Sequence, residues 1–406
     1  MNAGRASGTG WRGFERGEPA YRRIVLALFA AGFATFAQVF DAQAVLPAVG
    51  AELGLGAATA ALLVSATTVG LAVSVLPWSW VADRIGRVTA MKLSLVLATA
   101  FSLAVPLMPT FETVLVARGL VGLALGAVPA IAVAYLAEEL HAGWVTVAAG
   151  TYVAGNTVGG IVGRLVAGPL SEAVGWRVGL AAVAALGVLA AAVFWLLVPS
   201  PRGFARSDPA GPGFARRVLT NLADPVMLAL YGLGFLLMGS FGAVYNYLGF
   251  RITGAPFGVP ETLVSLIFVA YLAGTAASRV SGGLTTRFGM TRVVLGGIGL
   301  MVLGLVLMLA DVLAVVVLGL VVFTVGCFTA HPVASALSGR WALVGRGQST
   351  ALYQLSWLGG TAFFGWAVGL VYDRFGWMAT VVTVLGMAAT AAVVTVTGVR
   401  AGERRR

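Results

Sequence analysis

The chain has few charged residues and few of the side chains that build catalytic or metal sites. Asp, Glu, Lys and Arg form only 10% of its 406 residues, against about 25% in soluble domains. One lysine (Lys92), one cysteine (Cys327) and two histidines (His141 and His331) are present, so an internal disulfide is excluded. A P-loop and paired carboxylates are also absent from the sequence. We therefore expect no enzyme activity, no cofactor and no metal site.

Apolar residues, by contrast, make up 59% of the chain. Apolar runs follow one another along nearly the whole sequence, and each has the roughly 20 residues that a helix needs to cross a bilayer. The sequence thus predicts an all-α polytopic membrane protein embedded in the lipid bilayer. The twelve expected spans are 22–47, 57–81, 88–109, 112–136, 142–168, 176–198, 225–250, 262–284, 290–310, 312–337, 348–371 and 376–398.

The net charge of +11 comes mainly from arginines in the tails and between the apolar spans. This distribution argues against nucleic acid as a partner and fits the enrichment of basic residues in cytoplasmic loops. With both termini cytoplasmic, only Arg177, Arg251 and Arg374 fall in outside loops. The expected organisation is a cytoplasmic tail (1–21), a six-helix bundle (22–198), a cytoplasmic linker (199–224), a second six-helix bundle (225–398) and a basic tail (399–406).

The two halves repeat short motifs at nearly the same spacing. "SWVADRIGRV" follows the second span and "GGLTTRFGMTR" follows the eighth, while "VGWR" opens the sixth span and "FGWM" opens the twelfth. Such echoes predict a duplicated six-helix unit with pseudo-symmetric halves. Transporters built from parallel six-helix repeats bind their substrate between the halves, near the middle of the membrane.

The loop after the second span carries the most specific motif. It reads Ser79-Trp-Val-Ala-Asp83-Arg84-Ile-Gly86-Arg87 and resembles the G-x-x-x-D-R-x-G-R loop of the major facilitator superfamily, with Ser79 in place of the first glycine. The resemblance implies that Asp83, Arg84, Gly86 and Arg87 form a conformational gate. A solvated turn with topology-setting arginines is the alternative interpretation.

The fifth span resembles a glycine frame found in exporters of this superfamily that exchange substrate for protons. Arg164 replaces the proline of that frame and Ala167 replaces one glycine. Glycines every four residues also form a smooth stripe for close helix packing. Longer strings, such as "GTYVAGNTVGGIVGR", resemble a YnfM-like branch of bacterial inner-membrane efflux proteins. The predicted helix-packing residues are Gly150, Gly155, Gly159, Gly163 and Gly168.

Three charged residues of the first, fourth and fifth spans lie at a shared depth in the membrane. Asp41 lies near the outer end of the first span and Arg118 near the outer start of the fourth, both about 7–9 Å below the outer face. Arg164 lies near the outer end of the fifth span. We expect one or both arginines to stabilise Asp41. Asp41 then either exchanges a proton during transport or forms a permanent ion pair. Two arginines and one acid leave an excess positive charge, which could hold an anion; if Arg164 extends to the interface, this excess disappears.

Further polar residues in the spans are candidates for the transport pathway. Each of them either contacts substrate or only bridges neighbouring helices. His331 is a second candidate for proton coupling, beside Asp41 and Arg118, because histidine titrates near neutral pH; the alternative is a helix-packing role. The substrate-binding candidates are Gln38, Asp41, Arg118, Tyr152, Asn156, Arg164, Asn246, Tyr271, Gln354 and Trp357.

Taken together, these features predict a secondary transporter of the bacterial inner membrane that works by alternating access. We expect export of small molecules in exchange for protons, by a chain that suffices as a monomer. Uptake or facilitated diffusion of a small polar or anionic solute on the same fold is the alternative.

Overall fold

The computed structural model describes residues 11–203 and 214–404, so parts of the predicted tails and linker lie outside the described residues. The described chain is helical almost throughout. The helices of the N-terminal half are α1 (Pro19–Phe40), η1 (Asp41–Ala44), α2 (Leu46–Leu53), α3 (Ala57–Ile85), α4 (Arg87–Ala104), η2 (Val105–Leu107), α5 (Phe111–Leu125), α6 (Ala127–Glu139), α7 (Val145–Val174) and α8 (Trp176–Leu197). Those that follow are α9 (Phe214–Ala223), α10 (Pro225–Thr253), α11 (Glu261–Ser265), η3 (Leu266–Ala270), α12 (Tyr271–Phe288), α13 (Met290–Leu307), α14 (Leu313–Trp341), α15 (Arg346–Val394), η4 (Thr395–Val399) and α16 (Arg400–Arg404).

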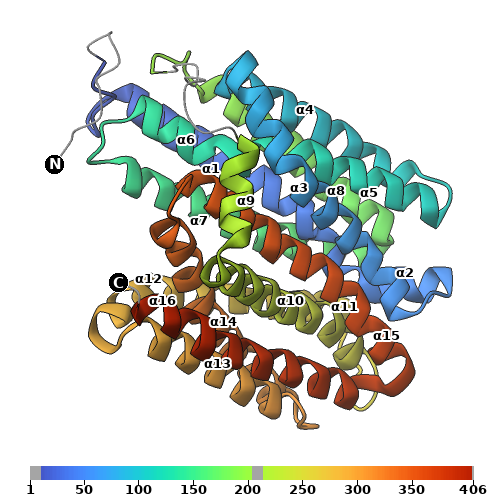
Figure 1. Ribbon diagram of the computed structural model, residues 1–406. Coiled ribbons are helices and arrows are strands. Elements are labelled where there is room, and N and C mark those ends of the chain that lie inside the picture. The colour runs from blue at the N-terminus through green and yellow to red at the C-terminus, as the bar shows by residue number, and fades with distance from the viewer. Residues whose placement is uncertain (1–10, 204–213, 405–406) are drawn as a thin grey trace.

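The helices form two bundles, with α1–α8 in one and α10–α16 in the other (Figure 1). Residues 11–18 and α16 lie at the same end of the molecule, which we call the terminal side; α2 and the α13–α14 turn lie at the opposite end, the far side (Figure 1). Eleven helical segments in the described chain are long and apolar enough to cross a membrane. The last of them contains two spans, because Gly376 interrupts α15 with non-helical backbone angles. The prediction of an all-α polytopic fold with twelve spans is confirmed.

Two pairs of glycines mark the duplication in the backbone. Gly86 and Gly289 both have positive φ angles, 91° and 83°, at the turns that follow α3 and α12. Gly175 and Gly376 repeat this at the next pair of corresponding turns, with φ angles of 100° and 74°. Side chains strongly disfavour this region of φ, and glycine enters it freely. The motif echoes in the sequence therefore correspond to equivalent backbone turns.

Several predicted spans differ in detail from the observed helices. The fourth is broken into α5 and α6 at Gly126, the fifth continues to Val174, and the first ends in the short 3₁₀ turn η1, where the Asp41 carboxylate accepts a hydrogen bond from the amide of Ala42. The eighth span contains the 3₁₀ segment η3 between α11 and α12. The predicted linker contains the helix α9, which packs against α10 and α15.

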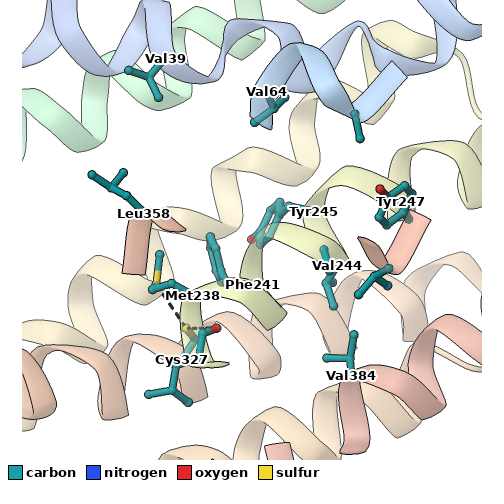
Figure 2. Packing of buried hydrophobic residues seen from close by; sticks show 14 of the residues in the cluster. Val39, Val64, Met238, Phe241, Val244, Tyr245, Tyr247, Cys327, Leu358 and Val384 are labelled. Carbon is teal, nitrogen blue, oxygen red and sulfur yellow. Dashed lines mark hydrogen bonds between the residues drawn. The ribbon is translucent and has the colours of Figure 1, made fainter. Parts of the chain in front are cut away.

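The apolar core extends across the two bundles. One cluster of buried side chains includes Val39 and Val64 from the N-terminal half and many residues of α10, α14 and α15. In Figure 2, Phe241 and Tyr245 of α10 lie between the ribbons that carry Val39 and Val64 and the region of Cys327. Cys327 is fully buried among apolar side chains of this cluster.

Hydrogen bonds join the two bundles on the far side. The carboxylate of Asp373, in the first part of α15 just before the break at Gly376, accepts from the amides of Ala57 and Ala58 at 2.8 and 3.0 Å. Glu172 at the end of α7 accepts from the amide of Thr262 in α11 at 2.7 Å. Both contacts use a carboxylate at a helix N-terminus, where exposed amides and the helix dipole favour negative charge. The bundles are thereby fastened together at the end opposite the termini.

Candidate substrate cavity

A cavity of about 230 Å³ lies between the two bundles. The N-terminal half contributes residues of α1, η1 and α7, and the C-terminal half contributes residues of α10, α12, α14 and α15. Most of its surface is apolar, and Arg164 is the only Arg, Lys, Asp or Glu among the described residues that line it. The lining residues are Phe36, Phe40, Gln43, Val153, Asn156, Thr157, Gly160, Arg164, Met238, Phe241, Gly242, Tyr271, Phe328, His331, Trp357 and Thr361.

The Arg164 side chain is fully buried and its hydrogen-bond partners are neutral. Nε and Nη2 donate to the same oxygen of Gln43 at 3.0 and 2.6 Å. Nη1 donates to the carbonyl of Gly160 at 2.7 Å, and Nη2 also contacts the hydroxyl of Tyr271 at 3.1 Å. Arg164 forms no direct ion pair with Asp41, which pairs with Arg118, and it does not extend to the interface, because its side chain turns into the space between the bundles.

Asp41 instead pairs with Arg118, as their shared depth predicts. The carboxylate and guanidinium are 2.8 Å apart, and the side chains are 4% and 1% exposed. Arg118 also donates to three backbone carbonyls, those of Gln38, Val39 and Leu63, at 3.2 Å each. Neither Asp41 nor Arg118 lines the cavity. The pair is therefore a buried link between α1, α3 and α5 within one bundle.

Gln43, which the sequence did not single out, connects Arg164 to the opposite bundle. Its amide nitrogen donates to the side-chain oxygen of Asn246 on α10 at 2.6 Å. Asn246 in turn donates to the carbonyl of Gly365 on α15 at 3.2 Å. No motif marks Gln43, and its neighbours in sequence are small and apolar; only the fold brings it between Arg164 and Asn246.

The remaining substrate-binding candidates divide into two groups. Asn156, Tyr271 and Trp357 line the cavity with Arg164, and so does His331. The Tyr353 hydroxyl lies 2.9 Å from Nδ1 of His331, which fixes the ring beside the cavity. The other predicted residues lie outside the lining: Gln38, Asp41, Arg118, Tyr152, Asn246 and Gln354. Gln38 is buried where its amide donates to the carbonyl of Ala34, and Tyr152 packs beside Gly32 of α1.

Comparison with known protein families agrees with this architecture. Residues 24–256 match the profile of the Major Facilitator Superfamily. The chain belongs to this superfamily. It is a multi-pass membrane transporter of the secondary type and not an enzyme.

Named relatives of the major facilitator superfamily cover most of the chain. The uncharacterized MFS-type transporter YybF of Bacillus subtilis is 33% identical over 90% of this chain and 91% of its own length. The inner membrane transport protein YnfM of Escherichia coli is 35% identical over 89% of this chain and 87% of its own length. The resemblance found in the sequence motifs is therefore confirmed.

Solved structures support the major facilitator fold. A bacterial homologue of the human lysosomal transporter Spinster, in an inward-facing and occupied conformation, superposes with a TM-score of 0.77. The alignment covers 95% of this chain and 98% of that structure, at 16% sequence identity. At this identity the similarity concerns the fold alone.

The loop motif that resembles the superfamily gate lies on the terminal side. Arg87 donates to Asp83 at 2.6 Å and to Glu138, at the end of α6, at 3.1 Å. Arg84 does not join this network directly, since its guanidinium stacks on the ring of Trp80 at 3.2 Å from the ring centre. Sequence reasoning missed Glu138 because it belongs to no motif and lies far along the chain.

The neighbouring Glu139 attaches the tail and the linker to the N-terminal bundle. Its carboxylate accepts hydrogen bonds from the amides of Arg202 and Gly203, and its carbonyl accepts from the amide of Phe14 at 2.8 Å. Trp11 donates from its ring nitrogen to the carbonyl of Glu138 at 3.1 Å. Residues that precede the first bundle in the sequence and residues that follow it are thus both attached to α6.

The glycine stripe of α7 lies against α1. A Cβ at Gly155 or Gly159 would collide with the backbone carbonyl of Phe29 or Phe33, and a Cβ at Gly163 would lie 2.8 Å from the carbonyl oxygen of Ala37. The other two predicted glycines lie elsewhere. Gly168 faces Ser265 of the opposite bundle, and Gly150 faces open space with no atom within 4 Å of a Cβ built there.

Proposed function

We propose that this transporter exports small organic molecules across the bacterial cytoplasmic membrane in exchange for protons. The terminal side is the cytoplasmic side in this proposal, which follows the distribution of arginines. The bundles 22–198 and 225–398 rock against each other about the cavity between them. The chain carries out the whole cycle as a monomer, since both halves of the pathway are in one chain.

The observation that carries the proposal is the placement of the cavity behind a closed far side. The contacts of Asp373 with Ala57 and Ala58, and of Glu172 with Thr262, fasten the outer end of the bundles. A cavity below this closure is the binding site of an alternating-access carrier in its inward-facing state. Alternating access requires these contacts to separate when substrate is released outside.

Proton coupling is assigned to the Asp41–Arg118 pair. An ionisable group buried in the membrane is a functional candidate by default. Burial opposes the charged form of a carboxylate and a nearby guanidinium favours it, so small movements of the bundle shift the balance between the two protonation states. His331, which lines the cavity, is the second candidate. Asp83, Arg84, Gly86 and Arg87 act as the gate of the inner side.

The glycine stripe of α7 supports an export role through its resemblance to the exporter frame. Its packing on α1 also joins the helix of Arg164 to the helix that leads into Asp41. Movement of α7 would therefore be transmitted to the Asp41–Arg118 pair. Uptake of a small polar or anionic solute remains the alternative outcome of the test.

The test measures cellular accumulation of fluorescent and toxic compounds in a host stripped of its own pumps. We compare wild type, Asp41→Asn and Asp41→Glu, with and without a protonophore, at equal protein amounts in the membrane. The control is Asp311→Asn, which alters an ion pair whose carboxylate is 74% exposed, outside the cavity.

If the protein exports, at least one compound should be kept out of cells that carry wild type, Asp41→Glu or the Asp311→Asn control, but not out of cells that carry Asp41→Asn. This exclusion should require an intact proton gradient. Continued export against a gradient by Asp41→Asn would make Asp41 a structural residue and leave His331 as the proton site. Greater accumulation in cells with the transporter than without it would establish uptake.

A further inference from the structure

The cavity wall contains a positive charge, that of Arg164, which forms no direct ion pair with any described acidic side chain. The ion pairs among the described residues leave out Arg164, and Asp41, the nearest acid by sequence reasoning, is occupied by Arg118 at 2.8 Å. Arg164 is 0% exposed, and within the described part of the chain its donors bond to Gln43, Gly160 and Tyr271. A buried charge without a counter-ion is costly. An anion that enters the cavity would explain why the buried charge of Arg164 is retained in its wall.

The geometry of the guanidinium matches a carboxylate. Nε and Nη2 form one edge of the planar fork, and both converge on the single amide oxygen of Gln43. A carboxylate presents two charged oxygens to the same edge and forms two parallel, charge-assisted hydrogen bonds. It would therefore compete favourably with the neutral amide for this edge.

The surroundings of Arg164 specify the rest of the ligand. The guanidinium carbon lies 4.9 Å from the ring centre of Phe40 and 4.6 Å from that of Phe268. Phe40 lines the cavity together with Phe241, Phe328 and Trp357. Aromatic walls favour an apolar or aromatic body, and a cavity of about 230 Å³ limits it to a small molecule.

We propose that the cavity binds small organic anions, specifically carboxylates with an apolar or aromatic body, with the carboxylate held by Arg164. This inference rests on the proposed function in one respect, that the cavity is the transport site. A purely structural Arg164, which only links Gln43 and Tyr271, would give no preference among ligands by charge.

The test measures the thermal unfolding midpoint of purified protein in a non-ionic detergent, titrated with matched probes. The probes are benzoate, 4-phenylbutyrate and 2-naphthoate, each beside its neutral amide. Variants are Arg164→Gln, Arg164→Lys and the control Arg177→Gln, whose arginine pairs with Glu52 at 2.7 Å and lies outside the cavity.

For wild type and Arg177→Gln, we expect at least one acid to raise the unfolding midpoint at a concentration about tenfold lower than its amide needs for the same rise. A factor of about ten corresponds to the loss of one charge-assisted hydrogen bond. Arg164→Gln should lose this preference and Arg164→Lys should keep part of it, because lysine retains the charge without the fork. The proposal is overturned if every acid stabilises wild type no better than its amide, or if Arg164→Gln keeps the preference.

The unliganded midpoints separate folding from binding. Because Arg164→Gln removes a buried charge that forms no direct ion pair with a described residue, its unfolding midpoint should equal or exceed that of wild type, whereas a structural role predicts a lower midpoint. Ligand binding in detergent depends neither on a proton gradient nor on the direction of transport. The ligand class can thus fail while proton-coupled export stands, and export can fail while the anion site stands.

Discussion

The buried ion pair of Asp41 and Arg118 gives the sharpest stability prediction. Replacing Asp41 with Asn keeps the size of the side chain and one acceptor for Arg118 but removes the negative charge. The Arg118 side chain that remains is 1% exposed and still donates to the carbonyls of Gln38, Val39 and Leu63. Loss of one partner from a buried pair costs about 3–5 kcal/mol. Because three carbonyls and the new amide oxygen still solvate Arg118, we expect about 3 kcal/mol, the low end of that range.

The assay is the free energy of unfolding in mixed detergent micelles, measured beside Asp311→Asn. The Asp311–Arg251 pair has the same 2.8 Å separation, but Asp311 is 74% exposed, so its loss should cost only ~0–1 kcal/mol. A double variant, Asp41→Asn with Arg118→Met, should recover much of the loss, because it removes the stranded charge. A loss below about 1 kcal/mol for Asp41→Asn, indistinguishable from the exposed control, would refute the reasoning from burial.

Two further predictions concern packing and the far-side closure. Gly159→Val should sharply reduce folded protein in the membrane, because its side chain meets the backbone of α1, whereas Gly150→Val, which faces open space, should be tolerated; size-exclusion profiles compare them. Asp373→Ala removes the acceptor for the amide of Ala57 and should weaken the closure by about 0.5–2 kcal/mol, the usual value of a helix cap. A cysteine at Ser65, which is 6% exposed, should then react faster with a thiol reagent; an unchanged rate would contradict a closing role for Asp373.

The sequence alone determined the fold class and much of its organisation. Lipid cannot satisfy backbone hydrogen bonds, so long apolar runs have to be helices, and their number and spacing predicted the spans. The repeated turns at Gly86, Gly175, Gly289 and Gly376 were visible as motif echoes because they depend on local backbone conformation. The Asp41–Arg118 pair was also accessible, since depth in the membrane follows from position along a helix.

The tertiary structure decided which polar side chains meet between the bundles. Depth alone could not distinguish Arg118 from Arg164 as the partner of Asp41, because that choice depends on the rotation of each helix about its axis. Gln43 and Glu138 were missed for a related reason: they join residues far apart in the chain. Side-chain direction at helix contacts is set by packing of whole helices, so the cavity and its isolated positive charge appear only once the helices are assembled.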